Sequence, residues 1–177
     1  MFIKKLTKIK KYDIIYIQRK NINKYDSRII KSKGSDNIEF YVDGSCSANG
    51  SKDAVGGFGV VGVENGEVVF TYSKTNTPTT NNREELRAIL YVLIQYGHLN
   101  PVVYSDSAYC VNSLTEWIYG WERRGWLKSD NQPPENLDLI KAYWEVLQKG
   151  YSIQLRKIKG HVGHKYNEMA DKLATRR

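Results

Sequence analysis

The sequence predicts an α/β domain in which helices flank a mixed five-stranded sheet. Three β-type segments come first and are separated by short turns, and later β-type segments alternate with amphipathic helical segments. Strands joined by hairpins are antiparallel, whereas strands joined through a helix are usually parallel. We therefore expect three antiparallel strands followed by parallel strands, with helices packed on the sheet.

The expected strands are short apolar segments bounded by turn residues. The first, IEFYV, runs into Asp43-Gly44, and Pro101 opens the apolar segment VVYSD. Asn65-Gly66 separates two apolar runs, which is a strong hairpin signal because both turn positions tolerate positive φ. The five expected strands are residues 38–42, 55–63, 67–73, 102–106 and 151–158.

The expected helices repeat apolar residues with helical spacing. In residues 81–96 the apolar stripe consists of Leu86, Ile89, Leu90 and Leu93. A glycine-containing loop precedes the last helix. The remaining helical segments are expected at residues 107–126, 136–149 and 165–175.

Positive charge is concentrated at the amino-terminal end of the chain. The formal net charge is +8, and residues 1–36 carry 11 Lys or Arg against three Asp, whereas residues 37–177 are neutral overall. We therefore divide the chain into a basic extension, residues 1–36, and a folded domain, residues 37–177. A basic arm on a neutral body favours a polyanionic partner, most often nucleic acid, and a solubilising tail is the alternative.

The cysteine content and the apolar runs indicate a compartment. Cys46 and Cys110 are too few for a secreted disulfide framework, which favours a reducing, cytoplasmic environment. No apolar run approaches the roughly 20 residues of a membrane span, and no secretory signal is expected. The basic, amphipathic start of the chain leaves a mitochondrial presequence as an alternative.

Two adjacent glutamates begin the helix expected at residues 81–96. The helical period places Glu84 almost opposite the apolar stripe, where it is expected to face water. It places Glu85 at the edge of the buried face, where the helix meets the sheet. The helix dipole tolerates acids in the first turn, so periodicity alone also allows both to be surface charges.

Three aspartates add to these glutamates. Asp43 ends the first expected strand and Asp106 ends the VVYS strand, so the two would project together if these strands are parallel neighbours. A turn residue and a helix N-cap are the respective alternatives. Asp171 points away from the apolar stripe of the last helix, and periodicity alone predicts that it faces solvent. Convergent carboxylates are typical of Mg²⁺ or Mn²⁺ sites, in which two ions can promote phosphodiester hydrolysis.

Six motifs occur in the order and spacing of a known family. Across residues 38–175 the chain resembles type 1 ribonuclease H, which cuts the RNA strand of RNA–DNA hybrids and leaves 5′-phosphate and 3′-hydroxyl ends. The resemblance implies the ribonuclease H-like fold and makes residues 37–177 the catalytic domain. The motifs are YVDGSC (41–46), TTNNREELRAI (79–89), YSDSAYC (104–110), WIYGWERRGWL (117–127), KGHVGH (159–164) and NEMADKLA (167–174).

The resemblance implies a catalytic set. Its metal-binding carboxylates would be Asp43, Glu85, Asp106 and Asp171, and they would hold two Mg²⁺ ions, with Mn²⁺ as an alternative. This agrees with the choice of Glu85 over Glu84 and overrides the solvent-facing expectation for Asp171. The loop residue His161 would assist proton transfer or product release. A zinc site made from His161, His164 and a cysteine is a remote alternative, and we otherwise expect His164 to be structural or exposed.

The resemblance also implies substrate contacts. An RNA–DNA hybrid differs from other duplexes because only one of its strands carries 2′-hydroxyls. A protein can contact these hydroxyls in the wide minor groove of the hybrid. Two groups of residues match family positions near the substrate. Around the groove these are Cys46 (through its backbone), Asn49, Thr80 and Asn82, and in a basic protrusion they are Trp117, Trp121, Arg123, Arg124, Trp126 and Lys128.

Each substrate assignment has a structural alternative. The groove residues could be turn or cap residues, and the tryptophans could be local packing for a short helix pair. We expect a monomer that binds an RNA–DNA hybrid, with the basic arm touching nucleic acid and no membrane association. The competing functions are a retroelement-type or other nuclease of the same superfold, and a non-catalytic hybrid-binding protein.

Overall fold

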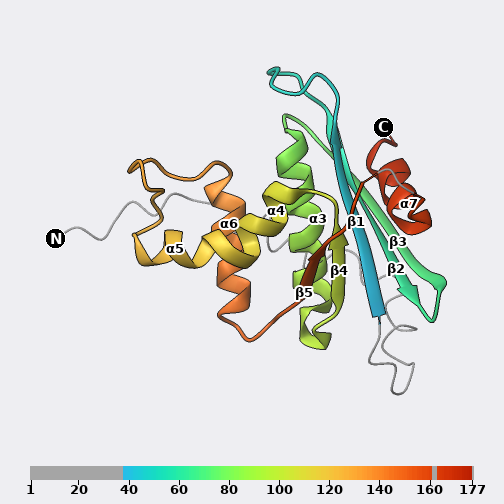
Figure 1. Cartoon of the computed structure of the whole chain (residues 1–177). Coiled ribbons are helices and arrows are strands. Elements are labelled where there is room, and N and C mark those ends of the chain that lie inside the picture. Colours follow the sequence, from blue (N-terminus) through green and yellow to red (C-terminus); the bar gives the residue numbers. More distant parts are fainter. Residues whose placement is uncertain (1–37, 161–162, 177) are drawn as a thin grey trace. The chain divides into compact units, whose positions relative to one another are not determined.

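The five strands form one mixed sheet in the computed structural model of the chain, in the order β3-β2-β1-β4-β5 (Figure 1). The structure describes residues 38–160 and 163–176, all within the unit Ser35–Arg177. The strands are β1 (Ile38–Cys46), β2 (Gly56–Glu64), β3 (Glu67–Asn76), β4 (Val102–Ser105) and β5 (Gln154–Lys157). The longer helices are α3 (Asn81–Tyr96), α6 (Leu137–Leu147) and α7 (Lys165–Ala174).

The pairing of the strands confirms the predicted mixed sheet. β1 is antiparallel to β2, and β2 is antiparallel to β3. On its other side β1 is parallel to β4, which is parallel to β5. The hairpin between β2 and β3 is confirmed as well, because Asn65 and Gly66 have φ values of 52° and 79°.

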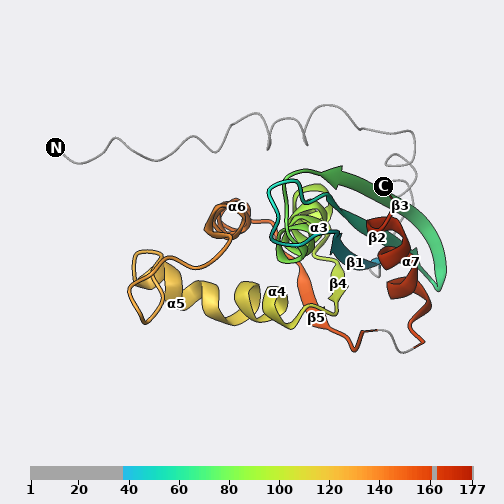
Figure 2. The same cartoon turned by 90° about the horizontal axis from the view of Figure 1, so that it is seen from above.

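The helices lie on both sides of the sheet (Figure 2). α3 packs on β1 and β2 from one side, with α6 behind it, and α7 packs on the same two strands from the other side. The beginning of α3 is as predicted, since Thr80 caps it by accepting a hydrogen bond from the backbone of Arg83. Among the described helices, none is long and apolar enough to cross a membrane.

Several predicted boundaries differ from the structure, and β3, for example, continues beyond the predicted residue 73 to Asn76. β1 does not end at Asp43 but continues to Cys46, because its antiparallel ladder with β2 extends to Gly56. The helix predicted at 107–126 is α4 (Ala108–Asn112), a π-helical segment (Ser113–Trp117) and α5 (Ile118–Arg123). It ends early because Gly125 and Trp126 have φ values of 67° and 69°, which no α-helix allows. β5 is confined to four residues within the predicted strand at 151–158.

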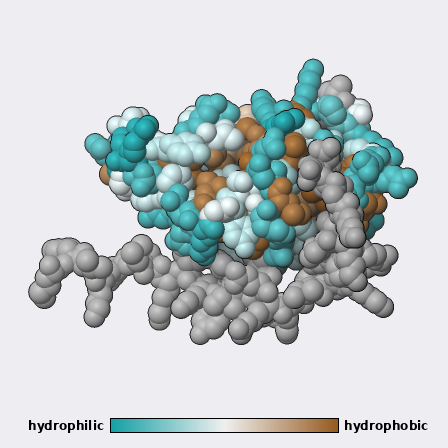
Figure 3. Space-filling model, turned by 90° about the horizontal axis from the view of Figure 1, so that it is seen from below, coloured by the Kyte–Doolittle hydropathy of each residue, from teal (hydrophilic) through white to brown (hydrophobic). Residues whose placement is uncertain are grey.

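The core lies between the sheet and α3. Its largest members are fully buried and include the predicted stripe of α3, namely Phe40, Val42, Leu86, Ile89, Leu93 and Ile140. A smaller cluster lies beneath α7, where Val61, Val63 and Ala170 are buried and the predicted stripe of α7 covers them. On the face shown in Figure 3, hydrophobic residues are interspersed with hydrophilic ones. The large hydrophobic side chains exposed among the described residues are Val68, Leu99, Trp117 and Tyr119.

Two glycines set how closely the helices approach the sheet. A Cβ atom on Gly44 of β1 would lie 2.2 Å from the backbone nitrogen of Glu85 in α3. A Cβ atom on Gly59 of β2 would lie 2.2 Å from the carbonyl oxygen of Ala170 in α7. Neither contact leaves room for any side chain, so each helix rests directly on strand backbone.

Replacing Gly59 by alanine should push α7 away from the sheet. The clash is with backbone atoms of α7, which cannot rotate aside, so Gly59→Ala should cost about 2 kcal/mol or more in unfolding free energy. Urea unfolding measures this decrease. Gly120→Ala is the matched control, because its Cβ would meet only the end of the Arg124 side chain, and alanine favours helix α5. Equal stability of the Gly59 variant and the wild type would contradict close packing of α7.

Candidate active site

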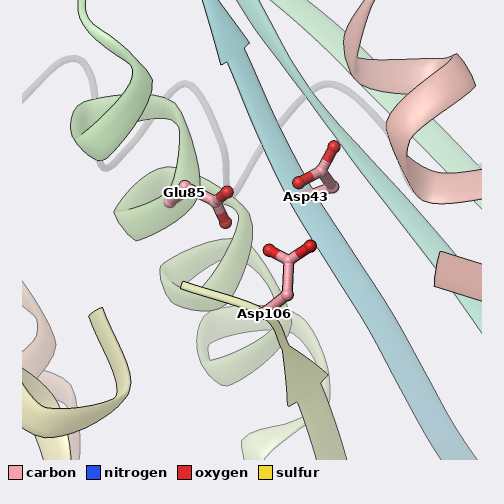
Figure 4. Close-up of side chains that lie close together, drawn as sticks. All are labelled: Asp43, Glu85 and Asp106. Carbon is pink, nitrogen blue, oxygen red and sulfur yellow. The ribbon is translucent and has the colours of Figure 1, made fainter. Parts of the chain in front are cut away.

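Three carboxylates from separate elements come together where β4 ends beside the central strand β1 (Figure 4). Asp43 lies on β1, Glu85 in the first turns of α3, and Asp106 directly after β4. One oxygen atom from each lies within 4.8 Å of the others. Asp43 and Glu85 are 8% and 7% exposed, and Asp106 is half-buried. This is an acidic cluster with little water around it.

The parallel ladder explains why the two aspartates meet. Tyr41 of β1 pairs with Tyr104 of β4, and each aspartate follows its tyrosine by two residues, Asp43 within β1 and Asp106 directly after β4. Successive side chains alternate between the faces of a strand, so both aspartates project to the same side as their tyrosines. The expectation that β1 and β4 are parallel neighbours is confirmed.

The structural alternatives for these aspartates, a turn residue for Asp43 and a helix N-cap for Asp106, are wrong. Asp43 is not in a turn, because it lies within β1 opposite Gly59 of β2. Asp106 does not cap α4, because the side chain of Ser107 accepts the capping hydrogen bond from the backbone of Cys110 at 3.3 Å. Neither carboxylate is therefore occupied by stabilising a turn or a helix end.

The two glutamates of α3 differ from expectation in one respect. Glu85 is buried beside the sheet, at the edge predicted for it. Glu84 was expected to face water, and this is wrong: its side chain is fully buried. The turn before α3 and the end of β3 cover the side of the helix opposite the core, and they supply hydrogen bonds to Glu84 from Thr79 and Asn76.

Burial and mutual repulsion control protonation in the cluster. Burial, and then the charge of Asp106, raise the pKa of Asp43 from 3.8 to about 7, although a hydrogen bond with Glu85 opposes this. Burial, and then the charges of Asp43 and Asp106, raise the pKa of Glu85 well above its usual value. Both effects disfavour the ionised carboxylates unless a cation joins them. The Oε2 atom of Glu85 has no hydrogen-bond partner among the described residues, so the donor set fits a divalent cation.

Helix α7 brings two further side chains to the cluster. Asp171 is half-buried and its charge contributes to the raised pKa of Asp43, but it is not in the group within 4.8 Å. Asn167, one helical turn earlier, is 3% exposed and donates a hydrogen bond from Nδ2 to Oδ2 of Asp106 at 3.2 Å. The sequence analysis did not single out Asn167. Its spacing of four residues from Asp171 was the available signal.

The KGHVGH motif contains two histidines, His161 and His164, and His161 was expected to act at the site. His161 lies outside the described residues. Gly160, just before it, is so close to Asp106 that a Cβ atom there would lie 2.7 Å from Oδ2. His164 is exposed, as expected. Within the described ranges, the acidic cluster is the group that could hold a metal ion, and a zinc site using His161 falls outside them.

The four residues expected near the groove lie in one neighbourhood around the start of α3. Thr80 caps the helix, and the side chain of Asn49 accepts a hydrogen bond from the backbone of Asn81 at 3.2 Å. The Cys46 thiol donates to the carbonyl oxygen of Thr79, and the Asn82 carbonyl oxygen accepts from the Cys110 thiol. Each of the four therefore has a structural role.

The tryptophans of the expected protrusion mainly pack on one another. Trp121 is buried with its ring centre 5.8 Å from that of Trp117, and Trp126 packs against Trp144. Trp117 is 41% exposed. The basic residues differ in availability, since Arg123 and Arg124 are exposed, whereas Lys128 forms an ion pair with Asp130 at 3.0 Å. Local packing accounts for Trp121 and Trp126, and leaves Trp117, Arg123 and Arg124 open to solvent.

The fold and the carboxylate cluster together define a hydrolase with an acidic site suited to divalent cations. The RNase H family model matches residues 35–177, and the chain belongs to the ribonuclease H family of nucleases. It is 39% identical over 138 residues to a ribonuclease H of Agrobacterium fabrum, covering 77% of this chain and 91% of that protein. It is 41% identical over 138 residues to a ribonuclease H of Actinobacillus succinogenes, covering 77% and 86%.

Solved structures agree with this assignment. LC9-RNase H1, described as a type 1 RNase H with the type 2 active-site motif, is 31% identical with a TM-score of 0.63, covering 77% of this chain and 69% of that one. The PFV RNase H domain gives a TM-score of 0.68 at 24% identity, covering 78% and 92%. The second likeness supports the fold alone, and the first supports the family as well.

The raised pKa of Asp43 predicts how the metal-free protein responds to pH. Between pH 4 and about 7 the folded protein keeps a proton on Asp43 that the unfolded chain has released. The unfolding free energy should therefore fall as pH rises through this range. Urea unfolding in EDTA at several pH values measures the slope. Asp43→Asn should flatten it, and an equal slope in variant and wild type would contradict the assignment of the effect to this cluster.

Proposed function

We propose that the protein hydrolyses the RNA strand of RNA–DNA hybrids and leaves 5′-phosphate and 3′-hydroxyl ends. The observation that carries this proposal is the convergence of Asp43, Glu85 and Asp106 in a buried acidic cluster on a ribonuclease H fold. A cluster of like charges is costly to bury, and divalent cations that bind its oxygen atoms relieve that cost. A phosphodiester backbone supplies the anionic substrate that such cations attract.

Each carboxylate has a proposed role in holding the cations. Asp43, Glu85 and Asp106 would bind two Mg²⁺ ions, or Mn²⁺, and Asp171 would join them from α7. When bound, such a pair of ions activates a water molecule and stabilises the leaving 3′ oxygen. Asn167 keeps Oδ2 of Asp106 oriented through its hydrogen bond. His161 is proposed to move a proton or assist product release from the loop that follows Gly160.

The start of α3 is proposed as the surface that recognises the hybrid. Asn49, Asn82, and the backbone at Cys46 would test for 2′-hydroxyls in the minor groove, since amides both donate and accept. Thr80 and Asn49 would hold a phosphate of the DNA strand. LC11-RNase H1, which shares the fold at 20% identity and a TM-score of 0.55, was solved in complex with an RNA/DNA hybrid, so this fold can accommodate such a ligand.

The protrusion and the basic arm are proposed to hold the nucleic acid outside the cluster. Three exposed residues of the protrusion can reach phosphates, namely Trp117, Arg123 and Arg124. Lys128 can do so by exchanging its ion pair with Asp130 for a contact with a phosphate. Trp121 and Trp126 would support this surface from beneath. We propose that residues 37–177 form a monomeric catalytic domain and residues 1–36 a separate arm that adds phosphate contacts.

The proposed activity is tested with labelled RNA presented alone, as duplex RNA and as a hybrid with DNA, alongside duplex DNA, in Mg²⁺ or EDTA. We expect cleavage of RNA in the hybrid only, and none in EDTA. Asp106→Asn should lower cleavage at least about a hundredfold and leave hybrid binding nearly intact, because the change removes one charge that holds the cations. Glu145→Gln, an exposed residue of α6, is the matched control.

Near-wild-type cleavage by the Asp106 variant would refute the proposed site. Cleavage of duplex DNA would instead assign the protein to another nuclease class of the same superfold. Tight hybrid binding without cleavage by the wild type would favour a non-catalytic hybrid-binding protein.

Removing residues 1–36 should weaken hybrid binding and make it less sensitive to salt. That segment carries 11 Lys or Arg, and the slope of log affinity against log salt becomes shallower by about one unit for every phosphate that the protein no longer neutralises. Binding titrations at several salt concentrations measure the slope for both proteins, with a neutral linker of equal length as the control. An unchanged affinity at low salt would show that the arm does not bind the hybrid.

A further inference from the structure

Glu84 is a fully buried carboxylate that the proposed chemistry does not use. It accepts hydrogen bonds from three side chains. Asn76 donates from Nδ2 at 2.8 Å, Thr79 donates from its hydroxyl, and Arg87, one turn later in α3, donates from its guanidinium. Both carboxylate oxygens are therefore occupied, and the negative charge is paired with Arg87.

Thr79 links this network to the ends of two strands. Its hydroxyl also accepts a hydrogen bond from Arg87 at 2.8 Å. Its backbone N–H donates to Ala54, and its carbonyl oxygen accepts from the thiol of Cys46 at the end of β1. Its methyl group lies where a Cβ on Gly56, the first residue of β2, would be only 2.6 Å away. The residue is 5% exposed, so these contacts hold it on every side.

The network lies next to the acidic cluster along the chain. Glu84 directly precedes Glu85, and the backbone of both residues rests on Gly44, immediately after Asp43. A shift or rotation of the first turn of α3 would therefore move the Glu85 carboxylate relative to Asp43. Gly44 limits how near α3 can come, and the hydrogen bonds of Glu84 to Asn76 and Thr79 limit how the turn can slide or rotate.

Stability alone is a weak reason for such an arrangement. A buried ion pair gives little net stability compared with apolar residues of similar size, because both charges must be removed from water. A fully satisfied polar network instead favours one geometry over its neighbours. Side chains that orient metal ligands commonly change metal affinity or activity by about tenfold to a hundredfold when removed.

We infer that Glu84 is a positioning residue, which acts with Thr79, Asn76 and Arg87 to hold Glu85 at the distance from Asp43 that a divalent cation requires. This inference rests on the proposed function only in so far as the cluster binds a divalent cation. It assigns to two adjacent glutamates of one sequence motif different tasks, one bound to cations and one bound to the protein.

Thr79→Val tests the inference, because valine has nearly the same shape and lacks the hydroxyl. We expect the Mg²⁺ concentration for half-maximal hybrid cleavage to rise about tenfold, with part of the missing rate recovered at high Mg²⁺. The rise in melting temperature caused by Mg²⁺ should shrink in parallel. Thr79→Ser keeps the hydroxyl and should restore the Mg²⁺ dependence of the wild type.

A stability control separates positioning from folding. Val146→Ala removes buried methyl groups from α6, a helix with no proposed site residue, and should lower the melting temperature without changing the Mg²⁺ dependence. All assays are run well below the lowest melting temperature. Asn76→Ala removes the link from β3 to Glu84 and takes the place of Thr79→Val if that variant does not fold.

An unchanged Mg²⁺ dependence in both Thr79→Val and Asn76→Ala would overturn the inference, as would a change of equal size in Val146→Ala. The melting measurement needs no substrate, so it tests the inference even if the wild type cleaves no hybrid. Absence of hybrid cleavage together with the expected Mg²⁺ shifts would refute the proposed function and leave the positioning role standing.

Discussion

Mutual repulsion among three carboxylates, two buried and one half-buried, is the constraint on which the rest of the structure depends. Asp43, Glu85 and Asp106 have oxygen atoms within 4.8 Å of one another and lack an ion pair with a basic side chain among the described residues. Left to themselves such groups separate or take up protons, and burial followed by this repulsion raises the pKa values of Asp43 and Glu85. The backbone must therefore hold them together, and the elements around the cluster have this effect.

The sheet and its glycines hold the cluster from two directions. The parallel ladder between β1 and β4 places the two aspartates side by side without help from their side chains. Gly44 lets α3 approach β1 from one face, and Gly59 lets α7 approach β2 from the other. The opposed helices then bring Glu85 and Asn167 to the same cluster, in which Asn167 donates a hydrogen bond to Asp106. The close approach of α7 thus explains Gly57 and Gly59 of β2, whose Cβ atoms would meet backbone atoms of that helix.

The fold was largely predictable because its signals are local. The Asn65-Gly66 turn, the capping Thr80 and the apolar stripe of α3 each act within a few residues, and all appear in the structure as predicted. The end of β1 was missed because Asp-Gly usually marks a turn, whereas here the pairing with β2, a partner distant in the sequence, extends the strand past Asp43.

The surroundings of single side chains were less predictable, since they depend on segments far apart in sequence. Helical periodicity treats one face of α3 as core and the other as solvent, so it could not foresee that Thr79 and Asn76 cover Glu84. It likewise gave no reason for Asp171 to leave the solvent, and only the family motif supplied one. Asn167 was overlooked because an asparagine beside an acidic site resembles any other polar helix residue.

Glu84 and Glu85 are alike in burial and charge, and they differ in the hydrogen bonds that their carboxylates accept. Both side chains are almost wholly removed from water. Glu84 accepts from two neutral donors and one guanidinium, so its lone pairs are occupied and its charge is balanced. Glu85 faces the carboxylates of Asp43 and Asp106 and accepts a backbone hydrogen bond from Gly44, and its Oε2 has no partner among the described residues. A cation entering this region gains interaction energy at Glu85, whereas at Glu84 it would first have to displace Arg87. The sequence places two equal charges one residue apart, and the fold pairs one of them with donors and leaves Oε2 of the other without a partner among the described residues.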